Sequence, residues 1–153
     1  KRCGNWHDGA PGRAAMTLRL ADFAGHWRLK KDIADILTGE AGTFLGRAEF
    51  REAEGGLSYH EDGQFTLGSA APLRAERRYF WRPDGDWVAV DYPDGRPFHR
   101  FRAADPVALH LCDPDTYEVA YGLSGWPDWT AMWTVTGPRK DYRMLCDYRR
   151  AAA

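Results

Sequence analysis

Alternation between apolar and polar residues runs through most of the chain after residue 25 and predicts β-strands. In residues 74–82, for example, Arg77, Tyr79 and Trp81 fall on one face of the expected strand and Glu76 falls on the other. Turn residues interrupt the alternation about every 8 to 12 residues, which is typical of all-β sandwiches and barrels. The pattern therefore predicts one antiparallel β domain.

The turns are short, and they favour a closed meander of strands. Residues 83–86 and 93–96 give the strongest signals, because each combines a Pro that presets φ with a Gly that tolerates positive φ. Many strands in one small domain must close or stack to hide their edges. We predict an antiparallel up-and-down β-barrel of about 8–10 strands, with a β-sandwich as the alternative. The expected strands cover residues 26–34, 43–51, 57–67, 74–82, 86–92, 96–102, 107–112, 116–123, 129–136 and 140–149.

The two ends of the chain have a different character. Residues 1–15 are polar, rich in glycine and without period, so we interpret them as a flexible arm or an expression remnant. Residues 151–153 look like a tail, which leaves 16–150 as a single barrel domain.

Residues 30–37 fit the end of a strand or a helical turn. A short helix is expected before the first strand, from the spacing of Leu18, Leu20, Phe23 and Ala24.

The pair Gly25-x-Trp27 stands at the first expected strand, and Arg149 and Arg150 stand on the last. This arrangement resembles the lipocalin and calycin barrels. The resemblance implies that Trp27 closes one end of the barrel and that a basic residue from the last strand packs over it. A guanidinium over an indole face is worth roughly 0.5–2 kcal/mol.

Four further runs are similar to an uncharacterised bacterial family of calycin-like domains, over about residues 20–150. They are YHEDG at 59–63, DGRPFH at 94–99, HLCDPDTY at 110–117 and WTVTGPRKDY at 133–142. The resemblance implies the barrel fold, and it implies no particular activity.

Aromatic residues make up 14% of the chain, more than a core of this size requires, and they suggest an aromatic-lined cavity. Barrels of eight or more strands can hold one small ligand, and such pockets are mostly apolar with a few converging polar groups. We therefore expect a small hydrophobic or aromatic ligand, with an anionic group on Arg78 or Lys140. The expected ligand-binding residues are Tyr59, Glu61, Arg78, Tyr79, His99, His110, Tyr117, Trp133 and Lys140.

The same polar residues also allow an enzyme without a cofactor. His99 or His110 with Asp115 and Tyr117 could act as acid and base on a small carbonyl or phenolic substrate, because imidazole titrates near neutrality. This alternative requires at least two of these groups to converge on one cavity site, about 3 Å from each other.

Other chemistry has weaker sequence support, so no metal and no cofactor is expected. His110 and Cys112 lie two residues apart and could bind zinc with His99, but the spacing is generic. Cys112 could also act as a nucleophile, and Lys140 could form a Schiff base. A haem would need one histidine ligand, for which the candidates are His26, His60, His99 and His110.

Charge and cysteine content bear on partners and compartment. The net charge is −1 and no basic stripe is present, so nucleic acid is not an expected partner. No apolar run approaches the roughly 20 residues of a membrane span. Three cysteines without a framework indicate a reducing, cytoplasmic setting, and we expect a monomer or homodimer.

A third possible function is a protein-interaction module with exposed Trp126 and Trp129.

Overall fold

A computed structural model describes residues 18–153, and ten β-strands with one short 3-10 helix account for most of them. The expected arm at residues 1–15 lies outside the described residues. The helix, η2, is a single turn where the sequence predicted a short helix. In chain order the elements are η2 (Leu20–Phe23), β1 (Gly25–Asp35), β2 (Ala41–Ala53), β3 (Gly56–Leu67), β4 (Leu73–Asp84), β5 (Trp87–Asp91), β6 (Pro97–Phe101), β7 (Val107–Cys112), β8 (Asp115–Gly122), β9 (Trp129–Gly137) and β10 (Lys140–Ala151).

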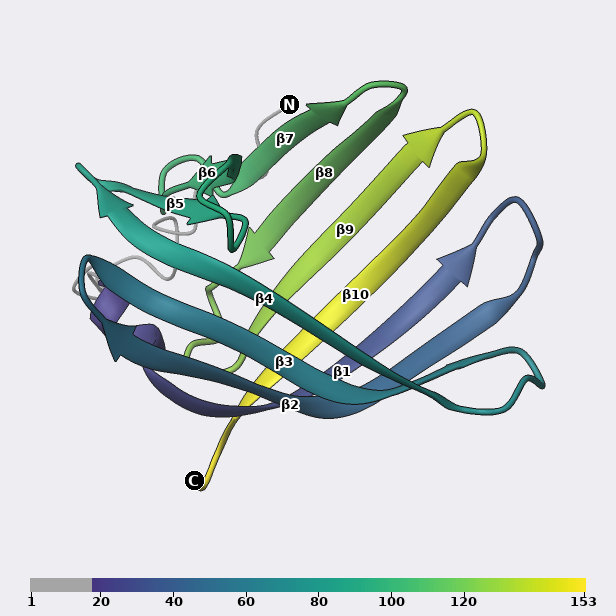
Figure 1. The fold of residues 1–153 in the computed structure, drawn as a ribbon, viewed down its shortest axis with the longest axis horizontal. Helices are drawn as coiled ribbons and strands as arrows, with labels where there is room; N and C mark the ends of the chain where they lie inside the picture. The colour runs from purple at the N-terminus through teal and green to yellow at the C-terminus, as the bar shows by residue number, and fades with distance from the viewer. Residues whose placement is uncertain (1–17) are drawn as a thin grey trace.

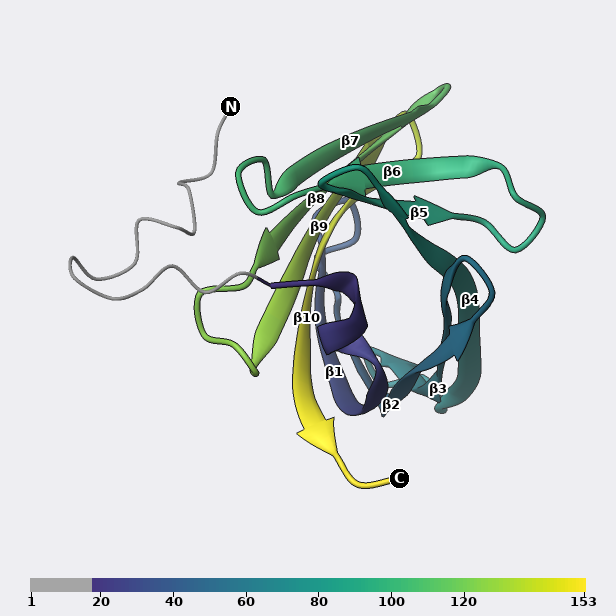
Figure 2. The same cartoon turned by 90° about the vertical axis from the view of Figure 1, so that its left-hand side faces the viewer.

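The ten strands form one antiparallel sheet in the order β6-β5-β4-β3-β2-β1-β10-β9-β8-β7. The sheet curls into a nearly closed barrel, in which the two edge strands β6 and β7 approach each other without a hydrogen-bonded ladder (Figures 1 and 2). A single continuous sheet confirms the predicted barrel and excludes the β-sandwich. β1 continues to Asp35, so the uncertain segment 30–37 is mostly strand.

Two glycines opposite each other let β2 and β3 curve sharply. Gly46 pairs with Gly63, and a Cβ added to Gly46 would lie 2.3 Å from the backbone oxygen of Asp62. A Cβ on Gly63 would lie 2.5 Å from the ring of Phe44. Side chains are therefore excluded at both positions, and the ring of Phe44 occupies the space that they leave.

One end of the barrel is closed by η2, which lies inside the ring of strands in Figure 2. Phe23, at the end of η2, is buried and packs edge-on against Trp129 and Trp126 at centroid distances of 5.2 and 4.9 Å. Trp129 is 1% exposed. The expectation that Trp126 and Trp129 form an exposed binding patch is therefore wrong, because both rings pack at this closed end.

The opposite end of the barrel is formed by the hairpins that join β1 to β2, β3 to β4 and β9 to β10, and no helix among residues 18–153 covers it (Figure 1). Within residues 18–153, no helix has the length and apolar character needed to cross a membrane.

Candidate functional site

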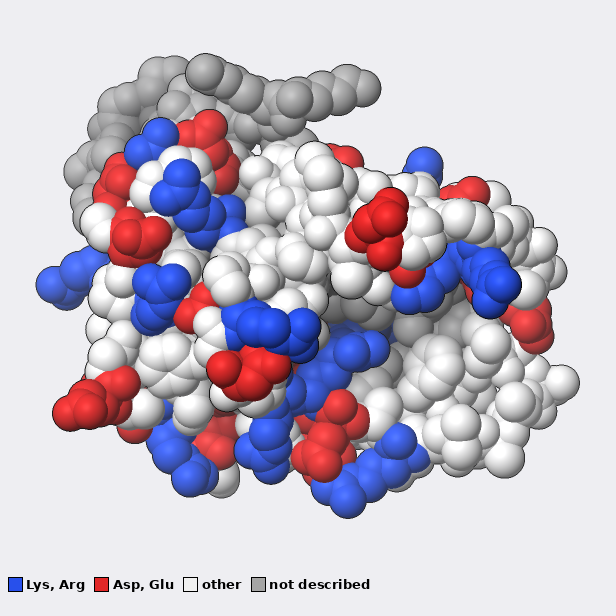
Figure 3. All heavy atoms as spheres, turned by 45° about the horizontal axis from the view of Figure 1, so that its top comes forward, with Lys and Arg blue, Asp and Glu red and all other residues white. Residues whose placement is uncertain are grey.

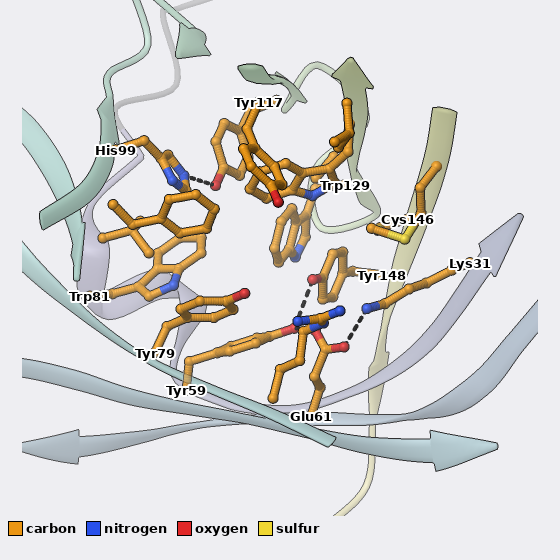
Figure 4. A pocket seen from close by; sticks show the side chains of 18 of the residues that line it. Lys31, Tyr59, Glu61, Tyr79, Trp81, His99, Tyr117, Trp129, Cys146 and Tyr148 are labelled. Atoms are coloured by element: carbon orange, nitrogen blue, oxygen red, sulfur yellow. Dashed lines mark hydrogen bonds and ion pairs between the residues drawn. The ribbon is translucent and has the colours of Figure 1, made fainter. Parts of the chain in front are cut away.

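The inward faces of the strands enclose a cavity of about 300 Å³ between the closed end and the middle of the barrel. Its walls are mostly aromatic, and Figure 4 shows their rings turned toward a common space. The face in Figure 3 is hollowed, and Lys and Arg side chains gather at the hollow. The aromatic wall consists of Tyr59, Tyr79, Trp81, Phe98, Tyr117, Tyr121, Trp129, Trp133, Tyr142 and Tyr148.

A chain of hydrogen bonds crosses the cavity floor from β1 to β10 (Figure 4). The Lys31 ammonium forms a buried ion pair with the Glu61 carboxylate. The hydroxyl of Tyr59 donates to the other oxygen of Glu61 at 2.6 Å and lies 2.8 Å from the hydroxyl of Tyr148. The ring of Tyr148 stacks on Trp129 at 3.7 Å. A buried ion pair is retained at low cost only when its remaining lone pairs are satisfied, which is the role of Tyr59 here.

Burial keeps the phenols of this floor protonated. Desolvation raises the pKa of Tyr59 and Tyr148 well above the usual value, and the neighbouring charge of Glu61 raises both further. Tyr79 is also mainly affected by burial, which raises its pKa to about 12. All three phenols therefore stay neutral at physiological pH, and the hydroxyls of Tyr59 and Tyr148 are engaged in the chain of hydrogen bonds on the floor.

Arg77 differs from the other two cations of the cavity wall in its pairing. Lys31 pairs with Glu61, and Lys140 lies 3.1 Å from a carboxylate oxygen of Asp115. Arg77 forms no ion pair with a carboxylate among residues 18–153. It lines the cavity from β4, and its side chain is exposed. Its guanidinium is therefore available to an anionic group inside the barrel.

His99 forms a neutral pair with Tyr121 on the far wall. Its Nε2 lies 2.7 Å from the Tyr121 hydroxyl, as the dashed line in Figure 4 shows. Burial, with a smaller effect of His110, lowers the pKa of His99 to about 3. The second ring nitrogen, Nδ1, and the indole nitrogen of Trp129 are buried without a hydrogen-bond partner among the described residues. A neutral imidazole offers one donor and one acceptor, so this wall retains unused hydrogen-bonding capacity.

Tyr117, Lys140 and Asp115 form a separate polar cluster in which side chains from β8 and from the start of β10 meet across β9. The Lys140 ammonium donates to the Tyr117 hydroxyl at 3.1 Å and pairs with Asp115 at the same distance. Both partners stabilise the charged form, Tyr117 more strongly, and hold the pKa of Lys140 above its usual range. This lysine remains protonated, which is unfavourable for the Schiff-base chemistry considered from the sequence.

Seven of the nine expected ligand-binding residues line the cavity, and two do not. Arg78 is the clearest correction, because it projects from the outer face of β4 and lies 3.8 Å from Glu76. Adjacent residues of a strand point to opposite faces, so Arg78 and Tyr79 cannot both face inward. His110 lies beside the cavity and packs edge-on against Phe98 at 5.0 Å. The cavity-lining residues are Tyr59, Glu61, Tyr79, His99, Tyr117, Trp133 and Lys140.

The four expected catalytic residues do not assemble into one group. His99 pairs with Tyr121, whereas Tyr117 and Asp115 are both bound to Lys140. In place of the predicted contact between a histidine and Asp115, the structure has a His99–Tyr121 pair and a separate cluster around Lys140. Cys112, considered as a nucleophile or metal ligand, is exposed at the end of β7.

The histidines considered for haem or metal are dispersed. His26 and His60 lie on the outer face of the sheet, where each approaches a glutamate. His60, Asp62 and Glu76 bring ligand atoms within 4.8 Å of one another. Arg74 already binds Asp62 through two hydrogen bonds of 3.0 and 2.8 Å.

Several residues that shape the cavity were not expected from the sequence. Arg77 carried a usable signal, because it lies in phase with Tyr79 and Trp81 on β4. No signal in the sequence indicated that Lys31 faces inward, because a lysine in an alternating strand is ordinarily on the outer face. The alternation of β10 gave no indication that Tyr148 would pair with Tyr59, because that partner is 89 residues away in the chain.

Comparisons with known proteins give one family and one fold. A family of unknown function, DUF6314, matches residues 23–150, which include all ten strands except the last residue of β10. No curated protein matches the chain. Among solved structures, the chain is similar to the S-type phycobiliprotein lyase from Guillardia theta, with a TM-score of 0.62 and 9% identity. The similarity covers 88% of this chain and 91% of that chain, and at such low identity it shows the fold alone.

Proposed function

The chain belongs to the family of unknown function DUF6314, and we propose that its barrel binds a small aromatic molecule that carries an anionic group. The anionic group would pair with Arg77, and the aromatic part would lie among the rings of the inner wall. This replaces Arg78 of the sequence-based hypothesis by its neighbour on the inward face. No covalent step is part of the proposal.

The unpaired guanidinium of Arg77 is the observation that carries this proposal. Arg77 is exposed and forms no ion pair with a carboxylate among residues 18–153, so a ligand carboxylate or sulfonate can pair with it without displacing such a partner. Arginine also binds such groups through two parallel hydrogen bonds, which fixes the orientation of the ligand. Lys31 and Lys140 already have carboxylate partners, so Arg77 is the natural anchor.

Cavity size and unused polar atoms support a hydrogen-bonding aromatic ligand. A cavity of about 150 Å³ can already bind benzene, and this one has about 300 Å³, which is room for more than one ring. The indole nitrogen of Trp129 and Nδ1 of His99 could each bond a polar atom of the ligand. Pockets with mostly apolar walls and a few such groups are typical small-molecule sites.

The named activity of the structural neighbour makes an enzyme the second possibility, since a barrel of this fold is called a lyase in Guillardia theta. The polar groups give this possibility less support than they give binding. An acid or base works best with a pKa near the working pH, whereas the pKa of His99 is about 3. We therefore propose binding as the primary function.

A pair of fluorescent probes tests the proposal with a matched pair of variants. The probes are 1-anilinonaphthalene-8-sulfonate and the uncharged N-phenyl-1-naphthylamine, which share their rings and differ in the sulfonate. We expect Arg77→Met to weaken binding of the sulfonate probe at least about tenfold, equivalent to about 1.4 kcal/mol. The adjacent, outward Arg78→Met should change it less than about twofold. The uncharged probe should bind wild type and both variants alike.

Two results would overturn the proposal. One is absence of binding of either probe to the folded wild-type protein. The other is equal binding of the sulfonate probe to wild type and Arg77→Met, which would remove Arg77 as the anchor.

A further inference from the structure

A second chamber, of about 290 Å³, continues the barrel interior toward the open end. It lies among β1, β2, β3, β4 and β10, and its lining includes residues at the ends of β1 and β3 that lead into the hairpins. The two chambers share five lining residues, Lys31, Glu61, Arg77, Tyr142 and Met144. They are therefore neighbouring compartments of one interior that meet at a common waist.

The waist is polar. It holds the buried Lys31–Glu61 pair and the guanidinium of Arg77, with the Tyr142 hydroxyl beside them. Tyr59, in the floor of the inner chamber, fixes the Glu61 carboxylate from one side. A ligand that passes through this level would meet charge and hydrogen-bond donors, and it would meet apolar walls on both sides.

The two chambers differ in the chemistry of their walls. Aromatic rings dominate the inner chamber, whereas the outer one combines the rings of Phe44 and Phe65 with aliphatic surface from Ile33, Leu67, Ala75 and Met144. None of the four aliphatic side chains is fully buried, because they line open space inside the barrel. This mixed apolar wall can bury a flexible hydrocarbon chain, because burial of apolar surface is favourable in any orientation.

We propose that the outer chamber is a subsite for an alkyl chain, so that the complete ligand is an aromatic acid with an aliphatic tail. The proposal rests on the proposed function, in which the ring occupies the inner chamber and the acidic group pairs with Arg77. The tail then runs from the waist along β1 toward the hairpins. Residues 31–35 of β1 cover about 13 Å at about 3.3 Å per residue, which sets the length of tail that the barrel can cover.

This arrangement predicts how affinity depends on tail length. Each methylene that is fully removed from water strengthens binding up to about fourfold. The gain should continue while the tail lies within the outer chamber and stop where the tail reaches solvent at the open end. A ligand confined to the inner chamber would show no such dependence.

A series of 6-alkylsalicylates provides the test, with methyl, propyl, pentyl, heptyl and nonyl tails measured by displacement of 1-anilinonaphthalene-8-sulfonate. We expect the heptyl compound to bind wild type at least about 30-fold more tightly than the methyl compound. In Ala75→Phe, which fills the outer chamber, this ratio should fall below about threefold, while the methyl compound keeps its affinity. Arg78→Phe adds the same ring to the outer face of β4 and should leave the wild-type ratio unchanged.

A second variant keeps the test valid if Ala75→Phe does not fold. Ile33→Ala removes aliphatic wall without adding volume, and it should weaken the heptyl compound at least about threefold more than the methyl compound. Equal affinities along the series in wild type, or the same ratio in wild type and the chamber variants, would overturn the subsite. Either result with intact, Arg77-dependent probe binding would leave the proposed function standing. Loss of that binding in wild type would overturn both.

Discussion

Arg150 lies over the indole ring of Trp27, with its guanidinium carbon 3.9 Å from the ring centroid. The same guanidinium donates hydrogen bonds to the backbone oxygens of Ala24 and Asp22 at 2.7 and 2.8 Å. Trp27 in turn donates from Nε1 to the backbone oxygen of Phe23 at 2.9 Å. The last strand, the first strand and η2 are thereby tied together at the closed end of the barrel.

Removal of this tie should destabilise the protein. In Arg150→Met the cation–π contact and two charge-assisted hydrogen bonds are lost, so we expect the free energy of unfolding to fall by about 2 kcal/mol. Urea unfolding followed by tryptophan fluorescence would measure the change. Arg149→Met, one residue earlier and on the outer face, should change it by less than about 0.5 kcal/mol. Equal losses in the two variants would contradict the role of Arg150.

Gly46 should tolerate no side chain. In Gly46→Ala the new Cβ would lie 2.3 Å from the backbone oxygen of Asp62 and 2.8 Å from the ring of Phe44, so β2 and β3 must separate locally. We expect a loss of at least about 2 kcal/mol in the free energy of unfolding, measured by urea titration. Gly125→Ala is the control, because its Cβ would approach only the backbone oxygen of Asp128 at 3.3 Å. Comparable stability of the two variants would show that the strands adjust freely.

His99 should make stability depend on pH between 7 and 5. Its pKa is about 3 in the barrel and near 6.5 in an unfolded chain, so below pH 6.5 only the unfolded chain takes up the proton. Stability contributed by the neutral imidazole is therefore lost as the pH falls, by about 2 kcal/mol at pH 5 relative to pH 7. Urea unfolding at pH 7, 6 and 5 would show this slope in wild type and its absence in His99→Gln.

The choice of pH range separates His99 from the carboxylates. Arg74 lowers the pKa of Asp62 and His60 lowers that of Glu76, mainly by hydrogen bonding, so both groups titrate below their ordinary range. Their contribution to stability is lost only below pH 5. His26→Gln, on the outer face of β1, serves as the control and should keep the wild-type slope. The same slope in wild type and His99→Gln would contradict the prediction.

Strand positions could be predicted well because their signals are local. On β4, the apolar phase of Tyr79 and Trp81 is visible within a few residues, and the turn that follows has its own Pro and Gly. The same alternation predicts Arg77 inward and Arg78 outward, because Arg77 is in phase with Tyr79 and Trp81.

The β5–β6 hairpin shows where strict alternation fails. The register shifts between Val90 and Asp91, and both Phe98 and His99 consequently line the cavity. An irregularity of this kind depends on how the hairpin fits the curvature of the barrel. Neighbouring residues of one strand are otherwise expected on opposite faces, so the sequence could not place both rings.

The sequence by itself determined that this chain forms an antiparallel barrel with aromatic residues on one face of many strands, because period-two alternation and turn chemistry are properties of short segments. Only the tertiary structure decided which cation of the cavity wall has no carboxylate in an ion pair. Lys31 meets Glu61 across 30 residues of chain and Lys140 meets Asp115 on another strand, while no carboxylate forms an ion pair with Arg77 among residues 18–153. Such pairings depend on curvature and register summed over the whole sheet, which no local pattern records.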